Sequence, residues 1–281
     1  MHLRLTGRHP LLSRNFQQAP EPDAGLVVDA SGLTFAGPLE LAATVALAHT
    51  ANAQGHSTSL ITAEDPNVTS YLQRMDVIRR MPAATAIDGR LPTEHRADLP
   101  GALLEVSHLN THTAEDLATR LGRLATAHFR GSVAGKIFAA VGELIDNAVD
   151  HGASPEGAFV AAQMYTGATS GRRGLEIAVC DTGVGVLAHL RRNPHHATVP
   201  DAASALACAL QRGVSGTTEG RGNGLNDLLT HLESSGVARF HLRSGNGLTT
   251  VSFRGQRRVR QSHATTTGVD GTWAWLRIRI P

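Results

Sequence analysis

The stretch ELIDNAVDHG, residues 143–152, decides the fold, and it lies in a helix that the sequence predicts to begin at Ser132. On this helix Glu143, Asn147 and Asp150 fall at positions i, i+4 and i+7, so their polar groups lie on one face. The opposite face is an apolar stripe formed by Ile137, Val141, Leu144, Ile145 and Val149. A helix of this pattern packs its apolar stripe against a sheet.

The polar face carries groups that suit magnesium and phosphate chemistry. The amide oxygen of Asn147 is a hard ligand of the kind that Mg²⁺ takes together with waters and nucleotide phosphates. The Glu143 carboxylate, one turn earlier, is suited to orient or deprotonate a water aimed at a γ-phosphate. Taken alone, a face of this kind is more often the solvated side of an amphipathic helix.

A second motif, Asp181-Thr-Gly183-Val-Gly185, follows a strand predicted over residues 175–180. An acid at the end of a strand can accept a hydrogen bond from the amino group of adenine, and the glycines let the backbone turn sharply and approach a ligand closely. Many strand-to-loop turns have the same composition, so this motif alone is weakly specific.

A third motif, Gly220-Arg-Gly222-Asn-Gly224, opens a helix predicted over residues 223–232. The unpaired N–H groups and the dipole at the start of a helix favour phosphate. The motif lacks the lysine of a P-loop, and it does not follow a strand in the way of a dinucleotide-binding unit. It too is weakly specific by itself.

The order of the three motifs is more specific than any one of them. In sequence they resemble the GHKL superfamily of gyrase B subunits, Hsp90, histidine kinases, MutL and the anti-sigma-factor serine kinases. The resemblance covers roughly residues 113–281. It implies an α/β (α+β) architecture, the Bergerat two-layer sandwich, in which helices cover one face of a mixed sheet of four or more strands.

The resemblance also implies a role for each matching residue, with ATP and Mg²⁺ as cofactors. Glu143 takes the position of the catalytic base, Asn147 that of the magnesium ligand and Asp181 that of the adenine-reading acid. The other nucleotide-binding positions are Asp150, Gly183, Gly185, Gly220, Gly222, Gly224 and Thr272, the last of which supports the adenine-reading acid. Residues 186–219 would form a lid that orders over the bound nucleotide.

Residues 1–98 are predicted to form a separate α/β domain with a linker, ahead of the ATP-binding domain at residues 99–281. Strands and helices alternate here, at 26–30, 38–53, 57–62 and from Pro66, and the loop-like stretch 82–100 is predicted to be the linker. Residues 26–81 resemble a STAS domain of the anti-sigma-antagonist kind. Ala36-Gly37-Pro38 stands where regulated STAS proteins carry an aspartate and a phosphorylated serine, which implies a role in interaction or nucleotide-state readout.

The composition narrows the class of protein. A length of 281 residues accommodates two domains, and 41% hydrophobic with 18% charged residues is typical of a globular protein. No apolar run approaches the ~20 residues of a membrane span, and no secretory signal is evident, so the sequence predicts a cytoplasmic protein. The net charge of +2 argues against general nucleic-acid binding. Cys180 and Cys208 lack the spacing of a disulfide or zinc site.

Arginines near the end of the sequence are the other charged feature. They are Arg254, Arg257, Arg258, Arg260, Arg277 and Arg279. Such a cluster suits an acidic partner or nucleic acid. Because the chain has almost no net charge, a solvated loop and strand face is the favoured interpretation.

Together these patterns predict a Mg-ATP-binding regulatory protein that hydrolyses ATP slowly and whose lid and partner contacts respond to nucleotide. A protein partner is expected, and a homodimer is a further expectation because related ATPases often dimerise. A serine/threonine protein kinase of the anti-sigma kind and a module that binds ATP without turnover remain open. A sensor histidine kinase is disfavoured, because none of His108, His112 and His128 begins the pattern of a phospho-accepting helix.

Overall fold

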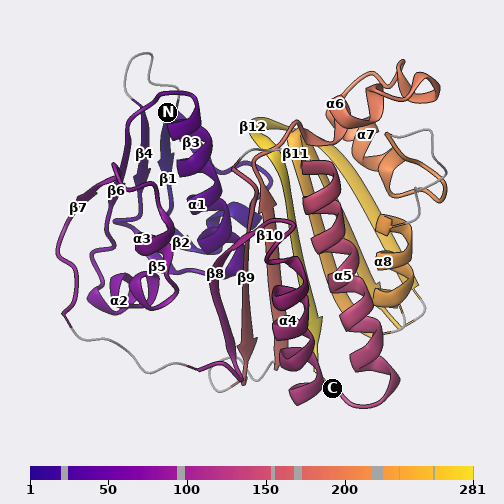
Figure 1. Ribbon diagram of the computed structural model, residues 1–281, viewed down its shortest axis with the longest axis horizontal. Coiled ribbons are helices and arrows are strands. Elements are labelled where there is room, and N and C mark those ends of the chain that lie inside the picture. Colours follow the sequence, from indigo (N-terminus) through magenta and orange to yellow (C-terminus); the bar gives the residue numbers. More distant parts are fainter. Residues whose placement is uncertain are drawn as a thin grey trace.

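The computed structural model describes residues 1–19, 25–93, 99–152, 156–167, 173–216, 224–233, 235–255 and 257–280. It is a mixed α/β structure with three sheets. Figure 1 shows the N-terminal unit on the left, then strands β8 to β10, and helices α4, α5 and α8 toward the right. No helix within the described ranges is long and apolar enough to cross a bilayer.

The N-terminal unit is built on a five-stranded sheet of order β3-β1-β4-β6-β7, in which only the β1–β3 pair is antiparallel. Its strands are β1 (His2–Arg4), β2 (Gly7–Arg8), β3 (Gln17–Ala19), β4 (Leu26–Asp29), β5 (Leu33–Phe35), β6 (Thr58–Ile61) and β7 (Ala86–Asp88). Its helices are η1 (Pro10–Leu12), α1 (Pro38–Ala53), α2 (Pro66–Arg74) and α3 (Val77–Arg80). The predicted strands at 26–30 and 57–62 and the predicted helix at 38–53 are confirmed. The prediction of a linker over 82–100 is wrong in part, because β7 lies inside it and pairs with β6.

The C-terminal unit is built on a five-stranded sheet of order β11-β12-β10-β9-β8. Its strands are β8 (Leu103–Leu109), β9 (Ala158–Tyr165), β10 (Gly174–Asp181), β11 (Val237–Arg254) and β12 (Arg257–Arg279). Its helices are α4 (Ala114–His128), α5 (Ser132–Gly152), α6 (Gly185–Arg191), η2 (Pro194–His196), α7 (Ala202–Ala209) and α8 (Gly224–Glu233). The sequence predicted α5, β10 and α8 to within a few residues.

The expectation of a mixed sheet is wrong for this unit, since every described pairing is antiparallel. For two of these pairs the reason lies in the connection. Strand β9 reaches β10, and β11 reaches β12, through short links that have no room for the crossover a parallel pair needs. Helices α4, α5 and α8 share a hydrophobic core with one face of this sheet.

Helix α1 covers the other face of the same sheet. It contacts β4 and β6 of its own unit on one side and β9, β10 and β12 on the other. Its residues from Pro38 to Ala48 are all buried, which explains why its sequence lacks a polar face. The side chains of Phe159, Trp273 and Trp275 belong to the same core as this helix. The two units are therefore joined through a continuous apolar layer.

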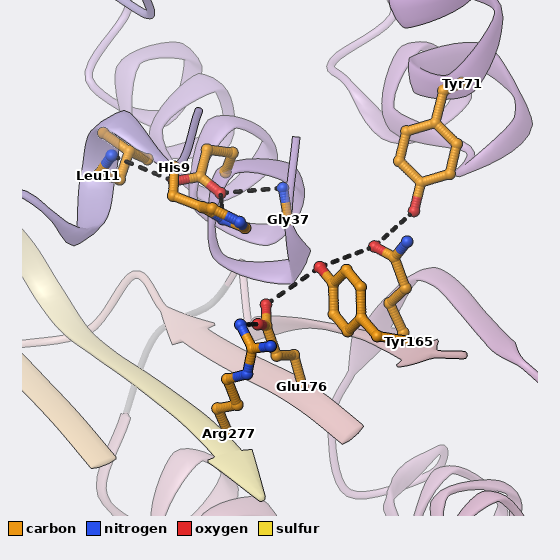
Figure 2. Close-up of polar contacts among 9 residues, drawn as sticks. His9, Leu11, Gly37, Tyr71, Tyr165, Glu176 and Arg277 are labelled. Carbon is orange, nitrogen blue, oxygen red and sulfur yellow. Dashed lines mark hydrogen bonds and ion pairs between the residues drawn. The ribbon is translucent and has the colours of Figure 1, made fainter. Parts of the chain in front are cut away.

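A polar network crosses the same junction (Figure 2). The Tyr71 hydroxyl donates to Gln163 Oε1 at 2.9 Å, and the Tyr165 hydroxyl lies 3.2 Å from the same oxygen and 3.1 Å from Glu176 Oε2. Arg277 Nη1 donates to Glu176 Oε1 at 2.8 Å. Glu176 is fully buried, and burial raises the pKa of its carboxyl, which the Arg277 charge opposes. This ion pair is thus the main compensation for a buried carboxylate.

The β11–β12 hairpin is long and folds back on itself. Its pairing has irregularities around Gly245 and Gly247. The Gly255 N–H at the hairpin tip donates to Gly236 O at 2.9 Å, so the tip returns to the start of β11. The far half of the hairpin consists of residues 247–254 and 257–264, and its Val251 and Phe253 side chains are buried in the core with α8.

Candidate functional site

A cavity of about 300 Å³ lies where α5 meets the end of β10 and residues 272–274 of β12, with α6 beside it. It brings together seven residues that the sequence predicted to act in one site, namely Glu143, Asn147, Asp150, Asp181, Gly185, Gly224 and Thr272. Gly183 does not line the cavity, but its backbone contacts Asp181. Gly220 and Gly222 lie outside the described residues, so their predicted role stays a prediction.

Asp181 ends β10 and is held from two sides. Its Oδ1 accepts the Gly183 N–H at 2.9 Å and the Thr272 N–H at 3.1 Å, so its own turn and the neighbouring strand fix the carboxylate. The residue is 6% exposed. Burial raises the pKa of this carboxyl to about 6, although the hydrogen bonds from Gly183 and Thr272 oppose the shift. The Asp181 carboxyl is therefore ionised at neutral pH and becomes protonated, and so uncharged, in mild acid.

Two glycines with positive φ shape the turns around this acid. Gly185 has φ +75° and Gly271 has φ +72°, a region that favours glycine. A Cβ on Gly271 would overlap the Asp181 carbonyl, and one on Gly185 would lie 2.7 Å from Ser244 Oγ. Ser244 links the turns, because its hydroxyl accepts the Val186 N–H at 2.9 Å and donates to Gly271 O at 2.8 Å. No local pattern in the sequence indicated this serine's role.

Gly271→Ala is expected to lower the free energy of unfolding by at least about 2 kcal/mol, through backbone strain and overlap with the Asp181 carbonyl. Gly255→Ala is the matched control, since Gly255 also has positive φ but a Cβ added there would have no atom within 4 Å. The free energy of unfolding of Gly255→Ala should fall by about 1 kcal/mol, the strain of the left-handed region alone. Urea unfolding of both variants measures the difference, and equal losses would contradict this packing.

The other end of the cavity is formed by α5 and the start of α8. The Asn147 amide donates to the Glu143 carbonyl one turn earlier, which fixes the orientation of its side chain. A Cβ on Gly224 would lie 2.6 Å from Glu143 Oε2 and 3.2 Å from Asn147 Nδ2, so α8 begins close to α5 and a larger residue there would displace the Glu143 side chain. The pKa of Glu143 is raised, first by burial and then by the Asp227 and Asp146 charges, while His231 opposes the shift.

The donor set of this end suits a hydrated divalent cation. The described lining contains four carboxylates, Glu143, Asp146, Asp150 and Asp181, and it contains neither lysine nor arginine. No cluster of three or more His, Cys, Asp or Glu among the described residues could hold a metal ion unaided. An ion here would therefore complete its shell with waters and phosphate oxygens, which is the habit of Mg²⁺.

An apolar wall completes the cavity, and the sequence did not identify it. It comprises Leu144, Val179, Val186, Leu190, Ala209, Val214, Leu225, Leu242 and Ala274. These residues come from helices and strands far apart in the sequence, so only the tertiary structure shows that they meet. Asp146 and His189 also line the cavity and were missed. Asp146 could have been found, because it lies three residues after Glu143 on the same helix.

No protein-family model matches the chain, and no curated protein matches it. Its function is therefore inferred from this site.

Proposed function

We propose that the chain is a Mg-ATP-binding regulatory protein of GHKL type that turns ATP over slowly. The observation that carries the proposal is the cavity itself, which is lined by a fixed acid at the end of β10, by an amide and a carboxylate on α5, and by an apolar wall. Cavities that hold small ligands are largely apolar and place a few polar groups for orientation. Residues from all three motifs that resemble this superfamily line the one cavity.

The buried half of the cavity suits a purine base. Val179, Leu242 and Ala274 offer apolar contact for the faces of the ring, next to the Asp181 carboxylate. An ionised carboxylate only accepts hydrogen bonds, so it favours the amino group of adenine over the carbonyl oxygen that guanine carries at that position. The proposal therefore includes selectivity for adenine.

The open half of the cavity suits the phosphates. A bound Mg²⁺ would supply positive charge against the phosphate oxygens, with Asn147 as its protein ligand. The Glu143 carboxylate lies on the same helix face and is suited to hold and deprotonate an attacking water. Helix α8 begins at Gly224 beside both residues, so its N-terminal N–H groups lie near this end.

The experiment that separates turnover from binding uses purified protein, Mg²⁺ and ATP labelled at the γ-phosphate. Release of labelled phosphate supports an ATPase, label on a protein supports the kinase alternative, and binding without either supports a module. Glu143→Gln keeps the shape of the side chain, so it should retain nucleotide binding while lowering phosphate release by at least about 100-fold. Unchanged release would remove Glu143 from the role of base.

The affinity for Mg-ATP is expected to fall as the pH decreases from about 8 to about 5. The pKa of Asp181 is about 6 without nucleotide, and the ionised form is a stronger acceptor for the adenine amino group than the protonated form, which also presents an O–H donor. Below that pKa the affinity should drop by about tenfold per pH unit. Without nucleotide, the raised pKa of Asp181 in the folded protein makes the folded state more stable in acid. This contribution to the free energy of unfolding decreases as the pH increases through about 6.

Titration calorimetry at several pH values measures this dependence. Protonation of ATP itself affects the wild type and Asp181→Asn alike. The difference between their pH dependences of Mg-ATP affinity therefore gives the effect of the Asp181 carboxyl. If the affinity of the wild type changed with pH in parallel with that of Asp181→Asn, Asp181 would not be the acid that contacts adenine.

The STAS-like resemblance is proposed to reflect an interaction role rather than a phosphoswitch. The start of α1 is buried, with Ala36 at 1% and Glu40 at 2% exposed. The Glu40 carboxylate accepts the Gly37 N–H at 3.0 Å and the Leu11 N–H at 3.1 Å (Figure 2). A carboxylate of the protein itself therefore already binds the backbone N–H groups at the start of this helix. Helices α6 and α7, proposed to belong to the lid, line the cavity and are suited to respond to nucleotide.

A further inference from the structure

We propose that residues 257–264 of β12, the arginine edge, bind an acidic segment of a partner protein as an added strand. These residues pair with 247–254 of β11 on one side. Strand β10 pairs only with residues 273–279 of β12, so within the described chain no strand covers the other side of the arginine edge. An uncovered edge presents N–H and C=O groups that another extended segment can pair with.

The charge of this edge is strongly one-sided. Arg257, Arg258 and Arg260 lie on it, Arg254 lies opposite Arg257, and all four are exposed. None of the four forms an ion pair with a described residue. The sequence from 237 to 269 contains no aspartate or glutamate, although the whole chain is nearly balanced at 26 basic and 24 acidic residues. Positive charge is therefore concentrated on this hairpin and lacks a partner within it.

The pairing register puts arginines on both faces of the edge. Arg258 and Arg260 stand opposite Phe253 and Val251, so they share the face that covers the core, and Arg260 Nη1 reaches Ala207 O at 3.4 Å. Arg257 belongs to the other face, as does Val259, which is 40% exposed. An added strand would thus meet a cation on either face, with one apolar contact between arginines.

Other occupants fit this surface less well. A second copy of the chain would place arginines against arginines, which repel. A nucleic acid would find no exposed aromatic ring between residues 254 and 264 on which to stack a base. Charged residues also keep edge strands from aggregating, a role that is compatible with pairing to an acidic strand. Arg277, in contrast, is engaged with Glu176 at the junction of the two units and does not belong to this surface.

Fluorescence anisotropy with a labelled peptide of alternating glutamate and threonine, about eight residues long to match the edge, tests the proposal. The peptide should bind the full-length protein saturably. The double variant Arg257→Glu/Arg260→Glu should bind it at least about 10-fold more weakly, because charge reversal removes complementarity. The matched control, Arg123→Glu/Arg130→Glu, makes the same charge change at exposed arginines elsewhere and should bind like the wild type. Unchanged thermal unfolding shows that both variants fold.

A second peptide, N-methylated at alternate residues, keeps every charge but loses backbone donors. It should bind at least about 10-fold more weakly if the segment adds as a strand. Three results would overturn the proposal: equal binding of both peptides, equal binding by both double variants, or no binding at millimolar peptide. Displacement of the peptide by a tighter-binding single-stranded oligonucleotide would assign the surface to nucleic acid instead. None of these outcomes depends on whether the cavity binds ATP.

Discussion

Asp181→Asn is expected to weaken Mg-ATP binding by at least about 100-fold while leaving the fold intact. The asparagine oxygen can still accept the N–H groups of Gly183 and Thr272, so the turn should survive. Its amide nitrogen, however, would present a donor to the amino group of adenine, and a site built for a hydrogen bond rejects a mismatched partner strongly. Titration calorimetry gives the affinity, and urea unfolding reports the fold.

A control for this variant lies on α4, outside the cavity. Arg123→Ala replaces an exposed side chain and should leave both the affinity and the stability unchanged. If Asp181→Asn bound Mg-ATP as tightly as the wild type, Asp181 would have no part in recognising the base.

Arg277→Ala is expected to lower the free energy of unfolding by about 3–5 kcal/mol, because it leaves a buried carboxylate without its counter-charge. Glu176 has no exposed surface, and Arg277 is the cation that bonds it, at 2.8 Å. The loss in the free energy of unfolding caused by Arg277→Ala should become smaller as the pH decreases. The pKa of Glu176 is already raised by burial, and without Arg277 it rises further, so mild acid neutralises the unpaired group.

Two further variants identify the cause of that loss. Arg279→Ala, at an exposed position on the same strand, should change the stability by less than about 0.5 kcal/mol. Replacing both partners with leucine should recover most of the deficit, since a buried ion pair can give way to apolar packing. A double variant as unstable as Arg277→Ala would show that the arginine acts through something other than charge.

The sequence predicted the motif-bearing elements well because their patterns are local. Helix α5 carries a complete apolar stripe, and β9 and β10 are apolar runs bounded by turn residues. Strand β8 was not predicted, because a register irregularity between Leu104 and Ser107 disrupts its alternation of apolar and polar residues. No strand was predicted over residues 257–269, because they are mostly exposed and rich in arginine and threonine and therefore show no apolar face.

The same limit applies to the site and to the junction of the units. Local motifs identified Asp181, Asn147 and Glu143, whereas the apolar wall and the Ser244 link depend on which distant strands become neighbours. The sequence of α1 did contain a signal, a helix apolar on nearly all sides, which indicates burial between two layers. It could not show that the second layer is the sheet bearing the proposed nucleotide site.

Titration calorimetry of the wild-type protein with Mg-ATP, beside Mg-GTP and beside ATP without Mg²⁺, tests the central claim most directly. We expect one saturable site for Mg-ATP, with weaker binding when the base is guanine or when the metal is withheld. A correctly folded protein that takes up none of these nucleotides, or that binds Mg-GTP as tightly as Mg-ATP, would contradict the proposed adenine-nucleotide site.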